Sequence, residues 1–254
     1  MMKSILITGA GSGIGRASAI ALSKNAEIRL ILVGRRVEAL EETLAELENR
    51  EQHVLLDVDI THKEAFAKSL RKALEPDSSL HGVFANAGIG GENTYGEGDR
   101  WDLILNTNLN GTYYTIMECL PYLRGTSGYK NILITSSCLA RFGVPNYTAY
   151  CTSKAGLLGL TRALAVELAH EQILVNALAP GWVDTEMARA GIQLLADRSG
   201  ATFDACLEQQ MSYVPTGKMS TPDEVGRLVT FLLTNQETSF TGNTFDINNG
   251  SFMN

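Results

Sequence analysis

Three residues in the middle of the chain have side chains suited to moving a proton: Ser137, Tyr150 and Lys154. Tyr150 and Lys154 are four residues apart at the start of a helical pattern, so a helix places both on one face. An ammonium group beside a phenol favours the phenolate, which predicts that the pKa of Tyr150 is lowered from about 10 toward working pH. Tyr150 would then act as a general acid or base at a carbonyl or carbinol oxygen. Ser137, just after an apolar run, would hydrogen-bond the same oxygen.

A glycine-rich turn near the start of the chain predicts a dinucleotide site. The apolar run Ile5–Ile7 leads into this turn, and a helical pattern from Arg16 to about Lys24 follows it. Glycines let the backbone approach a pyrophosphate, and the N-terminus of the following helix offers N–H groups and a positive dipole end to the phosphates. The residues expected to line the site are Gly9, Gly11, Ser12, Gly13, Ile14 and Gly15.

The end of the second predicted strand favours one dinucleotide over the other. NAD-binding folds usually place a carboxylate about 20 residues after the glycines, where it holds the ribose 2′-hydroxyl. Here the strand ends in Gly34, Arg35 and Arg36. A guanidinium suits a 2′-phosphate, which it binds through two parallel hydrogen bonds. We therefore predict NADP as the cofactor, with NAD as the alternative if both arginines are solvated residues at a helix start.

Strand and helix patterns alternate along the chain. Strands are expected at 4–8, 28–33, 53–57, 81–86, 130–136, 173–178 and 244–247, and helices at 14–24, 36–50, 61–75, 99–123, 149–170 and 222–234. This alternation predicts βαβ crossovers, and hence an α/β fold with a doubly wound, mostly parallel, seven-stranded Rossmann sheet and helices on both faces. Ligands of such sheets bind beyond the carboxyl ends of the strands, where the motifs above converge.

These motifs, in this order, resemble the short-chain dehydrogenase/reductase family, in its single-domain branch near the 3-ketoacyl reductases, from Ser4 to Gly250. Ser137, Tyr150 and Lys154 match the separations of the family's catalytic trio. The resemblance implies that Asn108 holds a proton-relay water, and that Lys154, with Tyr150, also contacts the cofactor. It implies further cofactor contacts from Asp57 and Val58 at adenine, Asn86, Ala87 and Gly88 after the fourth strand, and Pro180, Gly181, Val183 and Thr185 at the nicotinamide carboxamide.

Two positions depart from the family's commoner pattern. Ala85 replaces the first Asn of Asn-Asn-Ala-Gly, which changes a local turn contact. Ser12 stands where many NADP-preferring members carry Arg or Lys. The NADP prediction therefore depends mainly on Arg35 and Arg36.

The resemblance implies an oxidoreductase that transfers a hydride between NADP(H) and a carbonyl or secondary alcohol, with a 3-ketoacyl-type or small ketone substrate. Residues 1–254 are expected to form a single domain with 186–218 as a partly apolar substrate lid. Ketoacyl-carrier reductases often carry a basic residue near 170–172, where this chain reads His-Glu-Gln, which argues against a carrier-bound substrate.

Two other functions stay open at this point. One is an NAD-dependent secondary alcohol dehydrogenase of the 3-hydroxybutyrate or hydroxysteroid type. A remoter one is a non-catalytic dinucleotide-sensing protein, which would often lose the Tyr or the Lys of the trio. A methyltransferase with a similar sheet would not need the trio at all.

Composition limits the partners and the compartment. The chain has 254 residues, 44% of them hydrophobic, which is typical of one large globular domain. It has no apolar run of the roughly 18 residues that span a bilayer, and no room for a signal peptide before the first strand. A net charge of −7 argues against nucleic acid as a partner.

The cysteines and histidines lack metal-ligand spacing, so we expect a cytoplasmic chain with free thiols and no metal. The resemblance implies a homotetramer built on 99–123 and 149–170.

Overall fold

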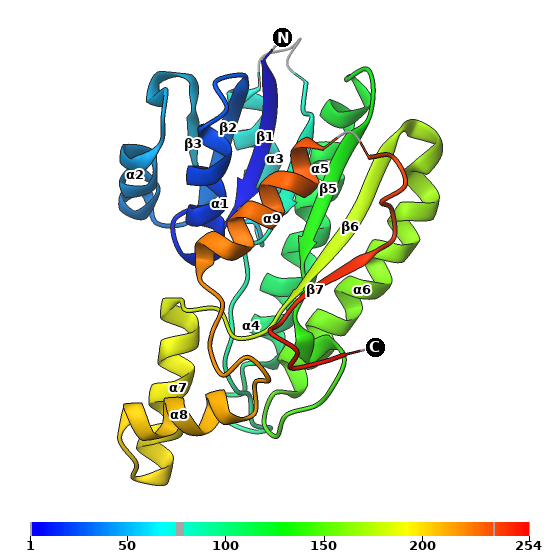
Figure 1. The fold of residues 1–254 in the computed structure, drawn as a ribbon. Coiled ribbons are helices and arrows are strands. Elements are labelled where there is room, and N and C mark those ends of the chain that lie inside the picture. Colours follow the sequence, from blue (N-terminus) through cyan, green and yellow to red (C-terminus); the bar gives the residue numbers. More distant parts are fainter. Residues whose placement is uncertain (1, 75–78, 236, 254) are drawn as a thin grey trace.

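Within the described residues, 2–74, 79–235 and 237–253 of a computed structural model, seven strands form one parallel sheet (Figure 1). Their order is β3-β2-β1-β4-β5-β6-β7. The strands are β1 (Lys3–Thr8), β2 (Ile28–Gly34), β3 (Val54–Asp57), β4 (Gly82–Ala85), β5 (Lys130–Thr135), β6 (Ile173–Pro180) and β7 (Thr244–Ile247). Every neighbouring pair is parallel, which confirms the predicted doubly wound sheet.

Helices cover both faces of the sheet because successive strand residues point to opposite sides. On one side, Leu6 of β1 and Phe66 belong to a buried cluster with Ile116. On the other side, Ile7 and Val229 belong to a second buried cluster. The first cluster is covered by α3 (Lys63–Ala73), α5 (Gly111–Arg124) and α6 (Thr148–Leu168), and the second by α1 (Gly13–Ser23), α2 (Val37–Glu46) and α9 (Pro222–Thr234).

The helix predictions agree with the structure except at 36–50, where α2 ends at Glu46 and Leu47 is extended, and at 99–123. There the chain forms a short α4 (Trp101–Leu105), a π-helical turn over Asn106–Asn110, and then α5. The prediction of 61–75 also extends to residue 75, which lies outside the described residues, whereas α3 ends at Ala73. No helix in the described part of the chain is both long and apolar enough to cross a membrane.

The segment predicted as a lid contains two helices, α7 (Glu186–Ser199) and α8 (Phe203–Ser212), which extend below the sheet in Figure 1. Hydroxyl groups cap both helices, from Thr185 onto α7 and Thr202 onto α8. Ile192 and Cys206 are buried in a small cluster that the two helices share. Part of the apolar character of this segment therefore serves packing between α7 and α8 and not a substrate pocket.

Candidate active site

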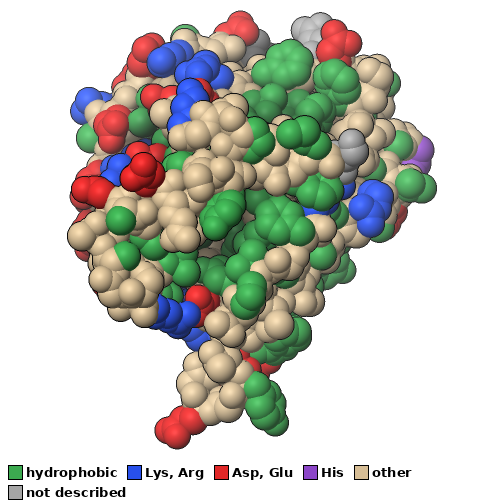
Figure 2. Space-filling model, turned by 60° about the horizontal axis from the view of Figure 1, so that its bottom comes forward, with side chains coloured by type: hydrophobic (Ala, Val, Ile, Leu, Met, Phe, Trp, Pro, Cys, Tyr) green, Lys and Arg blue, Asp and Glu red, His purple; other side chains and the backbone are tan. Residues whose placement is uncertain are grey.

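The strand order reverses beside β1, which places a crevice at the carboxyl ends of β1 and β4. A cleft of about 190 Å³ lies there, with Gly9 from the turn after β1 and Gly88 from the segment after β4 in its wall. All the strand arrows in Figure 1 point toward this edge. Figure 2 brings the edge toward the reader and shows hydrophobic side chains around a hollow.

The glycine turn is shaped to take a group against its backbone. Gly9 adopts a φ of +67°, a left-handed conformation that glycine reaches at no steric cost. A Cβ on Gly15 would lie 2.1 Å from the Gly9 carbonyl oxygen, so no side chain fits there. Ser12 begins α1 without a side-chain cap, which leaves the first N–H groups of the helix to a ligand. A dinucleotide pyrophosphate therefore fits this turn, as the sequence predicts.

The segment after β4 is fixed to the same turn. The backbone N–H groups of Asn86 and Ala87 both donate to Thr8 Oγ1, at 3.0 Å each. The Asn86 side-chain amide donates to the Thr8 carbonyl oxygen at 3.1 Å. Thr8 thus joins two predicted cofactor segments that are far apart in the sequence, since Thr8 and Asn86 are 78 residues apart.

The far end of the cleft contains Val58, as expected, and also Asp59 and Ile60. Asp57 lies exposed at the end of β3. Burial alone would raise the pKa of Asp59, but hydrogen bonds from Thr61 and the Arg35 guanidinium lower it overall. Asp59 was not among the predicted site residues, although it lies two residues past Asp57 at the end of the same strand.

Arg35 and Arg36 differ in what they contact. The Arg35 guanidinium forms an ion pair with Asp59 at 3.3 Å. Arg36 is exposed and, among the described residues, forms no ion pair. Arg36 lines both the cleft above and a neighbouring cleft of about 560 Å³ that also contains Ser12. Of the two arginines, Arg36 is therefore the one with a guanidinium available to an anionic ligand.

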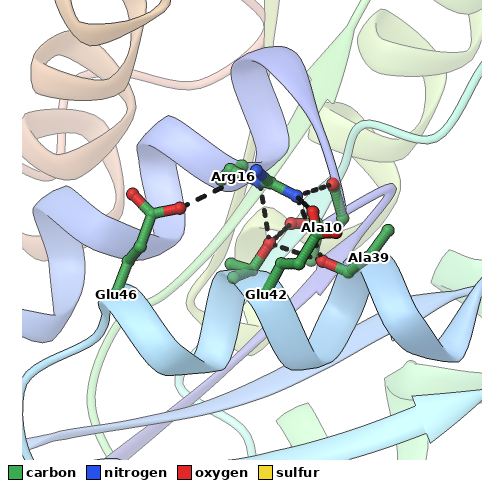
Figure 3. Close-up of polar contacts among 7 residues, drawn as sticks. Ala10, Arg16, Ala39, Glu42 and Glu46 are labelled. Atoms are coloured by element: carbon green, nitrogen blue, oxygen red, sulfur yellow. Dashed lines mark hydrogen bonds and ion pairs between the residues drawn. The ribbon is translucent and has the colours of Figure 1, made fainter.

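Arg16 is a structural residue of this site that the sequence analysis missed (Figure 3). From the first turn of α1 it donates to the Gly11 carbonyl oxygen at 2.8 Å and to Thr43 Oγ1 at 3.1 Å. It also pairs with Glu42 at 2.8 Å and with Glu46 at 3.7 Å. Arg16 thus fastens the glycine turn to α2. A cation at a helix N-terminus is unfavourable beside the positive end of the helix dipole. An arginine at this position of the predicted helix therefore indicated a specific partner.

The structure brings Ser137, Tyr150 and Lys154 together at the end of β5. Ser137 lies two residues after β5, and its hydroxyl hydrogen-bonds with the Tyr150 side chain. Lys154 is 4% exposed, and its Nζ donates to the Thr135 carbonyl oxygen at 2.8 Å. Ser136 Oγ donates to the Lys154 carbonyl oxygen at 2.8 Å, which holds α6 against β5.

The pKa of Tyr150 corrects the sequence-based expectation. Burial raises this pKa to about 12, although the hydrogen bond from Ser137 opposes the rise. Burial also lowers the pKa of Lys154 to about 8. Lys154 Nζ lies over the Tyr150 ring, 5.6 Å from its centre. Desolvation of the hydroxyl is the largest cause of the shift, and the phenol is protonated at neutral pH.

Asn108 lies in the π-helical turn and is fully buried. Its Oδ1 accepts from the Ile89 N–H at 2.8 Å, and its Nδ2 donates to the Ile89 carbonyl oxygen at 3.0 Å and to Ser153 Oγ at 3.2 Å. A Cβ on Gly88 would lie 3.1 Å from Asn108 Oδ1 and 3.5 Å from Lys154 Nζ. Asn108 therefore ties the segment after β4 to the helix of the trio. A π-turn is a common way to aim one side chain at a functional site.

The segment predicted to hold the nicotinamide reaches the glycine turn from the other side. Pro180 is the last residue of β6, and the Gly181 N–H donates to the backbone of β7. Val183 is buried, and Thr185 begins α7. The Thr185 methyl group lies 3.0 Å from where a Cβ on Gly13 would be. The two predicted cofactor segments are thus in contact.

Among the described side chains, no group of three or more His, Cys, Asp or Glu is placed to hold a metal ion. Cys138, beside Ser137, is buried, and burial raises the pKa of its thiol. A thiol with a raised pKa is a poor nucleophile at neutral pH.

Comparison with known proteins agrees with this fold. The chain matches the family model described as enoyl-(acyl carrier protein) reductase over residues 9–251. It belongs to the short-chain dehydrogenase/reductase family. It is an oxidoreductase of the kind that acts on CH–OH groups with NAD(P) as acceptor.

Several relatives span nearly the whole chain. The 3-oxoacyl-[acyl-carrier-protein] reductase FabG of Aggregatibacter actinomycetemcomitans is 30% identical over 256 residues, covering 98% of this chain and 99% of that protein. Levodione reductase has a similar crystal structure, with a TM-score of 0.89 and 26% identity, covering 98% of this chain and 96% of that one. A variant actinorhodin polyketide ketoreductase with NADPH gives a TM-score of 0.90 and 28% identity, covering 98% and 97%.

Proposed function

We propose that this protein is an NADPH-dependent ketone reductase that acts on a free 3-ketoacyl-type or small ketone substrate. The observation that carries the proposal is the convergence of Ser137, Tyr150 and Lys154 next to Gly88, at the end of a crevice that fits a dinucleotide. The relatives support it, because they include a 3-oxoacyl reductase and a ketoreductase with NADPH.

Each member of the trio has a distinct role in this proposal. A bound nicotinamide would supply the hydride to the carbonyl carbon. Tyr150 gives its proton to the carbonyl oxygen, and Ser137 donates a hydrogen bond that strengthens as negative charge develops there. Lys154, an ammonium below its pKa of about 8, holds the cofactor ribose. Lys154 also returns a proton to Tyr150, with Asn108 placing the water that links it to solvent.

The electrostatics favour reduction at neutral pH. A phenol whose pKa is about 12 carries the proton that reduction consumes. Oxidation of an alcohol would first require that proton to leave, which is unfavourable at neutral pH. This protonation state fits the reductive direction, and the cofactor test below separates the reductase from the alternative, an NAD-dependent secondary alcohol dehydrogenase.

We infer a free ketone and not a carrier-bound one from the surface at the end of α6. Glu171 binds both Nε and Nη2 of Arg124, at 2.5 and 2.7 Å. The pair neutralises an arginine that would otherwise attract an acidic carrier at this place. A bidentate pair of this kind also holds the guanidinium in a fixed geometry.

We also propose that residues 1–254 act as one domain, with 186–218 as the lid, and that the chain assembles as a homotetramer. Exposed apolar side chains on the predicted interface helices support the assembly, with Leu103 52%, Tyr113 45% and Val166 83% exposed. Exposed apolar side chains that gather on one surface often mark interfaces. Light scattering on the purified chain measures the assembly directly.

The cofactor preference is tested by Arg36→Ala. We expect the variant to bind NADPH about tenfold more weakly, because it loses a charged contact to the 2′-phosphate, while NADH binding stays unchanged. Affinities are read from the thermal shift at increasing cofactor concentration. Arg227→Ala, which removes an exposed arginine from α9, is the matched control.

Two results would contradict the cofactor assignment. One is a wild-type protein that NADH stabilises more than NADPH at equal concentration. The other is an Arg36→Ala variant that loses affinity for both cofactors equally, since a 2′-phosphate contact is absent with NADH.

A further inference from the structure

The helix that carries Tyr150 and Lys154 begins without a capping side chain of its own. Tyr147 is the N-cap residue of α6, and its side chain makes no capping hydrogen bond. The first N–H groups of a helix have no partner within the helix and need one from elsewhere. Tyr150 lies in this first turn, so whatever fixes the start of α6 also fixes the proposed proton donor.

Asn93, in the loop after β4, provides the missing cap. Its Oδ1 accepts from the Ala149 N–H at 2.9 Å and from Thr148 Oγ1 at 3.1 Å. Its Nδ2 donates to Asp99 Oδ1 at 3.3 Å, which orients the amide with its oxygen toward the helix. Asn93 is 8% exposed, so these contacts are shielded from water. The capped amide belongs to the residue directly before Tyr150.

On the basis of the proposed function, we propose that Asn93 is a positioning residue for Tyr150. It caps α6 from a loop that also lines the crevice, and its neighbour Glu92 ties that loop to the lid. Asn93 acts through Tyr150 and need not touch the substrate. A proton donor must lie within hydrogen-bond reach of its acceptor, so a small displacement of the start of α6 costs rate.

The tie to the lid is an ion pair between distant segments. Glu92, whose side chain is 10% exposed, pairs with Arg198 in the last turn of α7. Arg100 fixes the same loop by donating to the Gly90 carbonyl oxygen at 3.1 Å. At the other end of α7, the Met187 sulfur lies 2.9 Å from where a Cβ on Gly90 would be. The lid helix thus contacts, at both ends, the loop that caps α6.

Asn93→Ala tests the cap. We expect kcat with NADPH and a ketone to fall between about 10-fold and 10²-fold, because Tyr150 loses its fixed position. KM for NADPH should stay unchanged, since the glycine turn is untouched. The Ala149 amide should lose protection from hydrogen exchange, because its partner is gone.

A paired exchange separates positioning from a general folding defect. Asn93→Asp combined with Asp99→Asn keeps an acceptor for the Ala149 amide and keeps one amide donor between the two side chains. We expect this double variant to regain both kcat and the protection of the Ala149 amide. A folded double variant that regains neither overturns the proposal. A single Asn93→Ala variant with wild-type kcat or a protected Ala149 amide does so too.

The lid connection is tested with two arginines of the same helix. Arg198→Gln should raise KM for the ketone about two- to fivefold, the range of a partly exposed ion pair, with kcat nearly unchanged. Arg189→Gln is the comparison, since Arg189 pairs at 2.6 Å with Asp184, five residues earlier in the chain, and not with the loop after β4. Equal effects of the two variants would overturn the lid connection.

Failure of the proposed function has a different signature. A wild-type protein that reduces no ketone with NADPH would reject the reductase. The exchange protection of Ala149 in Asn93→Ala would then still decide whether Asn93 caps α6.

Discussion

Lys154 combines two properties that oppose each other. It is almost fully buried, with a hydrogen bond to the Thr135 carbonyl oxygen, and burial disfavours its charged form. Its pKa falls from 10.5 to about 8, so the ammonium persists at neutral pH at a cost in stability. A residue kept charged at such a cost is a strong candidate for function.

Replacing this lysine should therefore stabilise the fold while abolishing activity. The unfolded chain holds the Lys154 proton up to pH 10.5, whereas the folded protein releases it near pH 8. The penalty is complete below about pH 8 and fades as the pH rises toward 10.5. We expect Lys154→Met to have a higher free energy of unfolding than the wild type at about pH 7, and a smaller difference at about pH 10.

Denaturant unfolding at the two pH values measures this difference. Lys218→Met, whose side chain is 66% exposed in the wild type, serves as the control and should show no such pH dependence. A difference between Lys154→Met and the wild type that stays constant with pH would contradict the account of Lys154.

The pKa of Tyr150 is a property that residue spacing alone did not predict. A separation of four residues on a helix correctly predicted that Tyr150 and Lys154 lie close together. It did not predict the direction of the Tyr150 pKa shift, because that depends on how much protein surrounds the hydroxyl. Sequence spacing specifies neighbours, whereas desolvation is a property of the packed molecule.

At the scale of elements, the turn between β1 and α1 is the most demanding local structure of the site. Its backbone closes so tightly that a Cβ on Gly15 would lie 2.1 Å from the Gly9 carbonyl oxygen. Gly15→Ala should therefore distort the turn, lower the melting temperature and remove the stabilisation by NADPH. Titration of the melting temperature with NADPH reports both effects.

A second glycine in a helix provides the comparison for Gly15→Ala. A Cβ on Gly191 in α7 would meet nothing within 4 Å, so Gly191→Ala adds helix propensity without a clash. We expect it to stabilise the protein by up to about 1 kcal/mol and to leave NADPH binding intact. Normal NADPH binding by Gly15→Ala would mean that the turn is not where the phosphates lie.

The regular elements could be predicted from the sequence because their patterns are local. Buried parallel strands appear as short apolar runs and helices as amphipathic repeats, so elements recur where expected in β1, β2, β5, β6, α6 and α9. The π-turn at Asn106–Asn110 could not be predicted, because it is only one turn long and its residue types do not distinguish it from an α-helical turn. The cap of α6 was also hidden, since Asn93 lies 56 residues from Ala149.

At the scale of the whole molecule, the parallel sheet is what makes one site from distant segments. The reversal of strand order at β1 brings Thr8 and Asn86 into hydrogen-bond contact. The same edge holds Ser137 at the end of β5 and Thr185 after β6. The convergence of these segments could be predicted, because every parallel strand delivers its carboxyl end to one side.

Contacts that cross from one layer to another could not be predicted in the same way. Arg16 joins α1 to α2, and Glu92 joins the loop after β4 to Arg198 of the lid. Such pairs depend on how the helices and loops dock after the sheet has formed. No periodicity in the sequence marks the two partners of such a pair.

The most direct test of the account is the rate of NADPH oxidation with a panel of free 3-keto esters and small ketones, for the wild type and Tyr150→Phe. We predict turnover by the wild type with at least one ketone and a fall of about 10² or more in Tyr150→Phe, with NADPH binding retained. Turnover by Tyr150→Phe at the wild-type rate would contradict the assignment of Tyr150 as the proton donor. Failure of the wild type to oxidise NADPH with any ketone of the panel would contradict the reductase itself.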